Sequence, residues 1–401
     1  MNKEFGFAAK PMRRVYFDNN ATTPLLPEVR AAMEPYFSEQ FGNASSIHHH
    51  GQQTRSAVEQ ARESVAKLLG CRAAEVVFTS GGTEADNLGI FGVIQPGDHV
   101  ITSTIEHHAV LFSAHRLAEM GCPVTFVPVN GDGLVDLDDV RKALRPNTRL
   151  ISVMMANNET GVVQPVAPIG KIASEAGVSF HTDAVQAAGK LPLDVNAIGC
   201  HLLSISGHKL HAPQGVGALY VRKGTRLQPL FYGGRHERQR RAGTENVAGI
   251  VGLGKAAELA VAGLANGEVQ KMAALRDRLE SALLAATAAS GVNGGLAPRV
   301  PNTTNIYFDH IEGEALIIAL DLKGLAVSTG AACSSGATEP SHVLTAMKLA
   351  PDRARASIRF SLGKQNTQEE LDFAIALVPE TAARLRGLSP LWRKRSLALS
   401  S

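Results

Sequence analysis

Hydrophobic and polar positions follow two different spacings along most of the chain. Short apolar runs, typical of buried strands, alternate with longer stretches in which apolar residues recur at helical spacing. The runs predict strands at 15–17, 75–79, 99–102, 124–129, 150–155, 178–183, 202–205 and 216–221, and the stretches predict helices at 27–37, 53–69, 84–94, 106–120, 136–144 and 165–176. Such alternation predicts a mostly parallel sheet covered by helices on both faces, which is an α/β fold.

The C-terminal part of the chain has a different pattern. Residues 246–290 are alanine-rich and helical in spacing, and 291–301, rich in Gly and Pro, are predicted to form a linker or turn. The remainder mixes strands at 304–308, 325–328 and 357–360 with helices at 313–322 and 368–385. Because 401 residues exceed one small core, we expect a large domain at 22–262 and a smaller α+β domain at 263–401 completed by 1–21.

Composition narrows the class of protein. Apolar residues make up 44% of the chain and charged residues 19%, as in an ordinary globular protein, and the net charge of +3 is too small to favour nucleic acid or an anionic membrane as partner. We expect no transmembrane helix and no signal peptide. The four cysteines, Cys71, Cys122, Cys200 and Cys333, form no Cys-x-x-Cys pair, so no zinc site is indicated and a reducing cytoplasm is expected.

The stretch 201–211 carries the first candidate for chemistry. An apolar run there ends in Ser206, Gly207, His208 and Lys209, so this lysine follows a buried strand and a glycine turn. Burial lowers the pKa of an amine, and a neutral amine can attack a carbonyl and hold an aldehyde cofactor covalently. An ordinary surface lysine is the alternative.

A second candidate is the turn at 80–83, Ser-Gly-Gly-Thr, between a predicted strand and a predicted helix. Free backbone N–H groups at a helix start bind phosphate, and Gly82 and Thr83 would supply them. A plain turn with a threonine cap is equally compatible with the sequence. The turn matches neither Gly-x-Gly-x-x-Gly nor a P-loop, which disfavours nucleotide binding.

Further polar residues follow the predicted strands. Asp183 ends a strand and, if buried, needs a cationic partner such as a protonated pyridine nitrogen, which would make the ring an electron sink. Gln186, Asn158 and Ser206 can hydrogen-bond ring substituents or phosphate, and His107 can cover a ring face or move protons. With Lys209, this set predicts a pyridoxal phosphate site. His48, His49 and His50 point in different directions, which argues against a metal site.

These motifs resemble those of cysteine desulfurases, in the fold-type I, class V aminotransferase superfamily. The matching stretches are YFDNNATT (16–23), TSGGTEADN (79–87), NNETG (157–161), SISGHK (204–209) and RRAGTEN (240–246). The resemblance spans nearly the whole chain and implies a seven-stranded, mostly parallel sheet in the large domain. It implies a pyridoxal 5'-phosphate site formed by Gly82, Thr83, Asn158, Asp183, Gln186, Ser206, Gly207, His208, Lys209 and Thr244, the last donated by the second subunit of a homodimer.

The resemblance also assigns the substrate and the acceptor of sulfur. Arg359, with Asn158, would bind the carboxylate of L-cysteine, while Lys209 and His107 move protons. Cys333 lies in STGAACSSGA (328–337), whose small residues predict a mobile loop, and would take the sulfur as a persulfide. A buried, unreactive thiol is the alternative for Cys333, and it suits the other three cysteines better. No intrinsic metal site is expected, beyond transient ligation of a cluster by the Cys333 persulfide.

The resemblance suggests a role. The loop at 328–342, the stretches 209–213 and 241–246, and the short C-terminal tail look closer to the nitrogen-fixation branch than to the housekeeping branch. An iron–sulfur scaffold protein, serving nitrogenase assembly, is therefore the expected acceptor. A selenocysteine lyase or another class V aminotransferase is one alternative, and a non-catalytic sulfur-carrier scaffold is another. The intact set of Lys209, Asp183 and Cys333 disfavours the carrier.

Overall fold

A seven-stranded sheet forms the centre of the larger part of the molecule in the computed structural model, which describes residues 13–330, 340–388 and 392. In chain order its strands are β2 (Val76–Thr79), β3 (His99–Ser103), β4 (Val124–Val127), β5 (Thr148–Ser152), β6 (Ser179–Asp183), β7 (Leu202–Ser206) and β8 (Gly217–Val221). Their spatial order is β2-β8-β7-β6-β5-β3-β4. Only β8 runs antiparallel to its neighbours, so the predicted mostly parallel sheet is confirmed.

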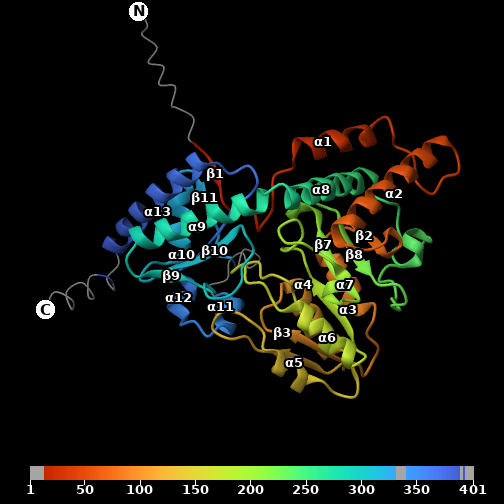
Figure 1. The fold of residues 1–401 in the computed structure, drawn as a ribbon, viewed down its shortest axis with the longest axis horizontal. Coiled ribbons are helices and arrows are strands. Elements are labelled where there is room, and N and C mark those ends of the chain that lie inside the picture. The colour runs from red at the N-terminus through yellow and green to blue at the C-terminus, as the bar shows by residue number, and fades with distance from the viewer. Residues whose placement is uncertain (1–12, 331–339, 389–391, 393–401) are drawn as a thin grey trace, which may run out of the picture.

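Helices cover both faces of this sheet (Figure 1). They are α2 (His49–Leu69), α3 (Gly82–Phe91), α4 (His108–Glu119), α5 (Leu137–Ala143), α6 (Val166–Glu175), α7 (Val195–Ile198) and α8 (Val247–Ala265), and α1 (Pro27–Met33) packs outside them against α8. Apolar side chains of α3 and α4 pack with one set of strand residues, and those of α2, α6 and α8 pack with another set. The strands are therefore buried on both faces, which explains why they appear as continuous apolar runs in the sequence.

Helix α8 is long and apolar enough to cross a membrane by length and composition, with a mean hydropathy of 1.6. In the fold it packs against α1 and α2, and Ile250, Leu253 and Ala257 lie in the core. It also carries Lys255 and Glu258, which form an ion pair on its exposed side. We therefore interpret α8 as a core helix of the large sheet layer.

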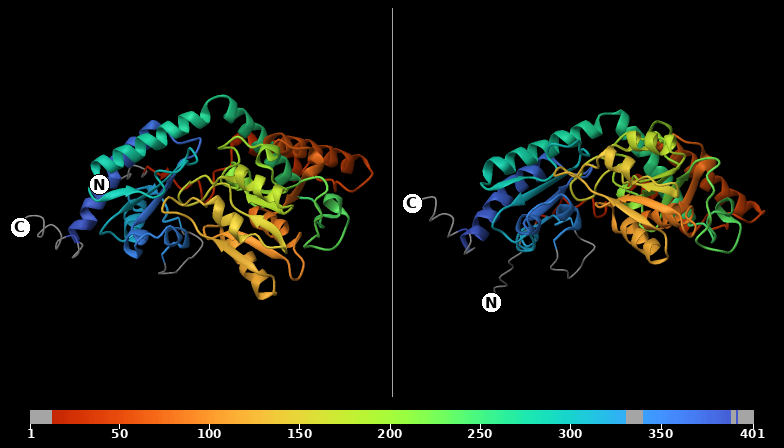
Figure 2. Two further views of the ribbon diagram at one scale, coloured as in Figure 1. Left: turned by 60° about the horizontal axis from the view of Figure 1, so that its bottom comes forward. Right: turned by 90° about the horizontal axis from the view of Figure 1, so that it is seen from below.

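The smaller part of the molecule is built around two short sheets. Strands β9 (Ser290–Val292), β10 (Thr303–Phe308) and β12 (Ser357–Ser361) pair antiparallel, and β1 (Val15–Tyr16) pairs parallel with β11 (Leu325–Ala326). The helices here are α9 (Glu268–Ala286), α10 (Gly313–Asp321), α11 (His342–Ala346), α12 (Pro351–Arg355) and α13 (Gln368–Leu388). Figure 2 shows α8 and α9 running along one side of both parts.

The N-terminal segment belongs to both parts. Val15 and Phe17 lie in the apolar core formed by α9, α10, α13 and β10, whereas the chain reaches the large sheet by α1. Conversely, Val343 and Leu344 of α11 join the core of the large sheet. The predicted domain limits at 21/22 and 262/263 remain predictions.

The helical character predicted for 246–290 is confirmed over most of the stretch, whereas the linker predicted at 291–301 was wrong in part. The helical stretch 246–290 is two helices, separated at Gly267, whose φ of 87° breaks the helix. Part of the expected linker 291–301 is strand β9, together with Ser290. Gly291 is needed there because a side chain would overlap the Tyr307 ring, so packing, and not a turn, explains this glycine.

Candidate active site

The carboxyl ends of the central strands bring the predicted residues together. Asp183 ends β6, Ser206 ends the adjacent β7, and Lys209 follows in the 3-10 turn η3 (Gly207–Lys209). Gly207 lets this turn pack closely, because a Cβ there would approach the Val216 side chain to 2.8 Å. In a parallel sheet such strand ends form the ligand crevice, as the sequence predicts.

The amine of Lys209 lies between this turn and the N-terminal segment. Its Nζ donates hydrogen bonds to the carbonyl oxygens of Asn20 (2.5 Å) and Ala21 (2.6 Å), and the side chain is half-buried. Lys209 is therefore not an ordinary surface lysine. Two backbone carbonyls fix the direction of its side chain into the crevice.

Asp183 is buried and belongs to a cluster of titratable groups. Burial raises its pKa to about 6, although the backbone N–H of Val185 (2.8 Å) and the charge of Lys209 oppose this shift. Ligand atoms of Asp183, Asp86 and His107 all lie within 4.8 Å of one another. Such a spacing also suits a metal ion, so the absence of an intrinsic metal remains a prediction.

Asp86, on α3, was not assigned a role from the sequence. It is buried, and Oδ1 has no hydrogen-bond partner among the described residues; the nearest cation-forming group is His181 Nε2, at 3.6 Å. Burial, and then repulsion by Asp183, raise its pKa well above the ordinary value. Two carboxyls this close cannot both ionise easily, so Asp86 holds the proton and Asp183, stabilised by Val185 and Lys209, carries the charge.

His107 precedes α4 and caps its N-terminus. Its Nδ1 accepts a hydrogen bond from the Ala109 N–H (3.2 Å), so the ring proton is on Nε2. Burial, together with the charge of Lys209, lowers the pKa of His107 to about 4. The imidazole ring is therefore neutral at physiological pH, and it can stack on a planar cofactor without adding a charge to the site.

An open cavity lies at the N-terminus of α3. It is lined by Ala21, Thr22, Ser80, Gly81, Gly82, Thr83, Glu84, Ser206, His208, Gln214 and Gly215. Gly82 packs closely here: a Cβ would approach Val185 to 3.0 Å and Ser206 to 3.3 Å, so a larger residue would displace these side chains. Backbone N–H groups and the positive end of the helix suit a phosphate monoester, so this cavity, which we call the cup, fits the predicted phosphate site.

Gln186 and Asn158 hold the N-terminal segment beside the site, and their contacts with the cofactor stay predictions. Gln186 Nε2 donates to the Asn20 carbonyl (3.0 Å), and its Oε1 accepts from the buried Lys190 (2.9 Å). The carbonyl oxygen of Asn158 accepts from Asn20 Nδ2 and from Arg359. The side-chain amide of Gln186 is thus engaged in holding the N-terminal segment.

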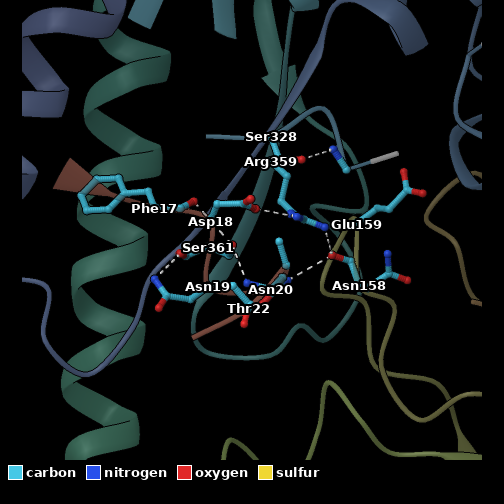
Figure 3. A network of polar contacts seen from close by, with 12 residues as sticks. Phe17, Asp18, Asn19, Asn20, Thr22, Asn158, Glu159, Ser328, Arg359 and Ser361 are labelled. Carbon is cyan, nitrogen blue, oxygen red and sulfur yellow. Dashed lines mark hydrogen bonds and ion pairs between the residues drawn. The ribbon is translucent and has the colours of Figure 1, made fainter. Parts of the chain in front are cut away.

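Arg359, on β12, connects the smaller part of the molecule to Asp18 and to the loop at Asn158 (Figure 3). It is buried, and donates from Nη2 to Asp18 (2.6 Å) and from Nη1 to the carbonyl oxygen of Asn158 (2.9 Å). Its Nε has no hydrogen-bond partner among the described residues. Binding of a substrate carboxylate by Arg359 stays a prediction.

Asn20 connects the two halves of the site, and the sequence did not reveal this role. Its amide contacts Lys190, Asn302 and Thr303, and its backbone N–H donates to Ser361 Oγ. The backbone carbonyl oxygen of Asn20 also accepts the hydrogen bond from Lys209 Nζ. Asn20 lies in the motif at 16–23, which marks it as a candidate site residue. Its partners, however, are up to 341 residues away along the chain and cannot be inferred from local spacing.

One predicted residue, Thr244, lies apart from this cluster. Thr244 is exposed and does not line the cup of its own chain. Cys333, with the loop predicted to be mobile, lies outside the described residues. The residues flanking that segment both contact Glu159: Ser341 Oγ donates to Oε2 (2.6 Å), and a Cβ at Gly330 would lie 3.1 Å from its side chain.

Comparison with known proteins gives the family. Residues 15–373 match the model of the class-V aminotransferases. The chain is 48% identical to cysteine desulfurase IscS of Dictyoglomus turgidum, covering 94% of this chain and 97% of that protein. It is also 48% identical to cysteine desulfurase NifS of Azotobacter vinelandii, covering 95% and 96%. A solved NifS-like protein, 38% identical, superposes with a TM-score of 0.87 over 93% of this chain and all of that one. The chain belongs to the class-V aminotransferase family and, within it, to the cysteine desulfurases.

Proposed function

We propose that this enzyme removes sulfur from L-cysteine with pyridoxal 5'-phosphate, giving L-alanine and a persulfide on Cys333. The observation that carries the proposal is a connected set of contacts next to the cup: Asn20 and Asn158 link Lys209 to Arg359, and the charge of Lys209 acts on Asp183. The family depends on this cofactor, and the buried carboxylate, the nearby amine and the glycine-lined cavity fit its ring nitrogen, aldehyde and phosphate.

The residues divide the work of binding and proton transfer. Arg359 pairs with the substrate carboxylate, and Asp183 carries the negative charge that keeps the ring nitrogen protonated. The cofactor, when bound, supplies an electron sink. Lys209 removes and returns protons at the substrate α and β carbons, and neutral His107 offers its Nε2–H beside the ring.

Sulfur transfer then needs a thiolate. The Cys333 sulfur attacks the sulfur of cysteine, so an S–S bond forms while the substrate C–S bond breaks. The electron pair of that bond passes to the β carbon, which takes a proton and becomes the methyl group of alanine. The sum is cysteine plus thiol giving alanine plus persulfide, which balances without an outside oxidant.

Chain connectivity supports Cys333 as this thiol. Gly330 lies beside Glu159 at the edge of the site, and three residues of extended chain reach roughly 10 Å from there. Among the described cysteines, burial raises the thiol pKa of Cys71 and of Cys200 to about 12. These two are poor nucleophiles at neutral pH.

Replacing Cys333 by alanine tests the proposal. We expect alanine release from cysteine to fall about hundredfold or more, because the sulfur acceptor is removed. Cys71→Ala removes a thiol outside the site and serves as the matched control, with turnover unchanged. Full turnover in Cys333→Ala would exclude Cys333 from the reaction.

A homodimer, in which Thr244 reaches the cup of the second subunit, is part of the proposal. In support, Phe231 and Tyr232 are exposed by 51% and 83% in the single chain, near this threonine in sequence. His236 Nδ1, Arg240 Nη1 and Glu245 Oε2 are buried polar atoms without a hydrogen-bond partner among the described residues. A second copy could cover the aromatic rings and provide partners for these atoms.

Hybrid dimers of Lys209→Ala and Thr244→Ala chains test this contribution. One site of the hybrid combines an intact Lys209 with an intact Thr244 from the other chain, so its affinity for the cofactor should equal that of the wild type. The Thr244→Ala homodimer should bind the cofactor weakly. If every site of the hybrid also binds it weakly, Thr244 is not donated between subunits.

The destination of the sulfur and the compartment are also proposals. The sequence motifs favour an iron–sulfur scaffold protein, serving nitrogenase assembly, as acceptor, and a cytoplasmic location. Cys71, Cys122 and Cys200 are unpaired, which agrees with a reducing compartment. Persulfide transfer to purified nitrogen-fixation and housekeeping scaffolds, compared at equal concentration, tests the acceptor: faster transfer to the housekeeping scaffold would contradict the nitrogenase role.

A further inference from the structure

A strained stretch lies in the segment that precedes α8. Glu237, Arg238 and Gln239 have φ values of 45°, 56° and 66°, in the left-handed region that favours glycine. None of them is glycine, so each is held there against a steric cost. Such a run persists only where contacts of the surrounding structure impose it.

The Glu237 side chain makes those contacts. Its carboxylate accepts from Arg62 Nη1 (2.6 Å) and Nη2 (2.8 Å), and from the backbone N–H of Phe78 (2.9 Å). Arg62, on α2, also donates to the Val76 carbonyl (3.0 Å) and lies over the Phe78 ring. Both charged side chains are almost fully buried, at 4% and 3% exposure. We call this pair the clamp; it fastens the segment to β2, the edge strand.

A second attachment follows Glu237 along the segment. Arg241 donates to both carboxylate oxygens of Glu84, at 2.9 and 3.2 Å. Glu84 lies in the first turn of α3 and accepts from the Ser80 N–H (2.8 Å), so it belongs to the cup. The segment is thus attached both to β2 and to α3, the strand and the helix on either side of the turn that forms the cup. Thr244 follows shortly after Arg241 in the chain.

We infer that Glu237 is a positioning residue for cofactor binding, acting through Thr244. Its bonds to Arg62 and Phe78 force the left-handed turn, and this turn sets the path of residues 240–244 over the surface. Glu237 touches neither the cup nor the crevice residues itself. The inference rests on the proposed function, in which Thr244 binds the phosphate held by a second copy of this chain.

A double-mutant cycle on cofactor affinity tests this inference. Titration of the apoenzyme with pyridoxal 5'-phosphate should give about tenfold weaker binding for Glu237→Gln and for Thr244→Ala. If Glu237 acts through Thr244, the double variant should bind within about twofold of Thr244→Ala alone. An additive loss, about hundredfold, would overturn the inference.

The matched control is Glu280→Gln. Glu280 forms a comparable two-bond pair with Arg299 in the smaller part of the molecule, with side-chain exposures of 16% and 9%. It should lose a similar amount of thermal stability with no change in cofactor affinity. If Glu237→Gln does not fold, Arg62→Lys replaces it in the same cycle, with the same expectation.

Two further results distinguish a failure of this inference from a failure of the proposed dimer with its Thr244 contact. A wild-type chain that sediments as a monomer would refute the dimer. Unchanged cofactor affinity in a dimeric Thr244→Ala protein would refute the role of Thr244. In a dimer where Thr244→Ala does weaken binding, additivity refutes the role of Glu237 alone.

Discussion

The two ends of the cofactor site are built differently. At the ring end Asp183 and Asp86 are buried and His107 is half-buried, and the protonation of all three is set by burial and by neighbouring charges. The cup at the phosphate end is open to the surface, and Thr83 in its lining is exposed. In the proposed dimer, the chemistry depends on one chain, whereas the affinity for the cofactor also depends on a surface of the second chain.

The largest effect should come from Lys209→Ala. Removing the amine removes both the attachment of the cofactor and the proton carrier, so turnover should fall about thousandfold or more, with loss of the yellow chromophore. Lys364→Ala, at a lysine paired with Glu268 outside the cup, should keep both. An unaltered chromophore in Lys209→Ala would contradict the assignment.

The site residues that could be predicted from the sequence are those whose role is set by their position after a strand. Lys209, Asp183 and Ser206 each follow or end a buried strand, and the parallel sheet then brings them together. Asp86 could not be found in this way, because a single acidic residue on a helix is usually exposed. Asp18 and Asn20 depend on partners in β12 and β10, far along the chain, and local pattern does not register such pairs.

The strands and helices themselves were predicted largely within a few residues. Helix α2 starts at His49, before the expected 53, because His48 provides a side-chain cap through its hydrogen bond from the Gly51 N–H. Strand β9 was missed because Gly291 was taken as a sign of a turn, whereas it makes room for the Tyr307 ring. The short helices α7, α11 and α12 were also missed, since four or five residues show no helical periodicity.

Asp183→Asn should have the next largest effect. The amide keeps the shape but not the charge, so kcat should fall about hundredfold with little change in KM. Asp86→Asn is the matched variant. Since Asp86 is the protonated member of the pair, an amide in its place should lower kcat by less than about fivefold. Equal losses in the two variants would contradict the proton assignment.

Arg359→Lys should act on binding. A lysine cannot keep Asp18, the Asn158 carbonyl and a substrate carboxylate at once, so KM for cysteine should rise about tenfold or more, with a smaller change in kcat. Arg355→Lys, at an exposed arginine paired with Asp352, is the control. A loss confined to kcat would argue that Arg359 does not bind the substrate.

Glu106→Gln should give the smallest effect, on stability alone. Burial raises the pKa of Glu106 to about 8 from an ordinary 4.5, so the folded protein keeps a proton that the unfolded chain releases. The free energy of unfolding should therefore decrease as the pH rises from about 5 to about 8, by at most about 1.4 kcal/mol per pH unit. Urea unfolding at several pH values should show a flatter profile for Glu106→Gln.

Glu75→Gln is the control for that profile. Hydrogen bonds from Arg72 lower the Glu75 pKa to about 2 against the opposing effect of burial, so Glu75 is ionised in both states above pH 6. Its replacement should shift stability equally at every pH from 6 to 8. An unchanged pH dependence in Glu106→Gln would show that Glu106 is ionised in the fold.

The central claim is that sulfur leaves cysteine and arrives on one thiol of this chain. The most direct measurement is mass spectrometry of peptides from the cofactor-loaded enzyme after brief treatment with L-cysteine and alkylation of thiols and persulfides. The account predicts one additional sulfur atom on the peptide that contains Cys333, and none in a Lys209→Ala protein treated in the same way. Additional sulfur on Cys71, Cys122 or Cys200 instead, or on no peptide while alanine is formed, would contradict it.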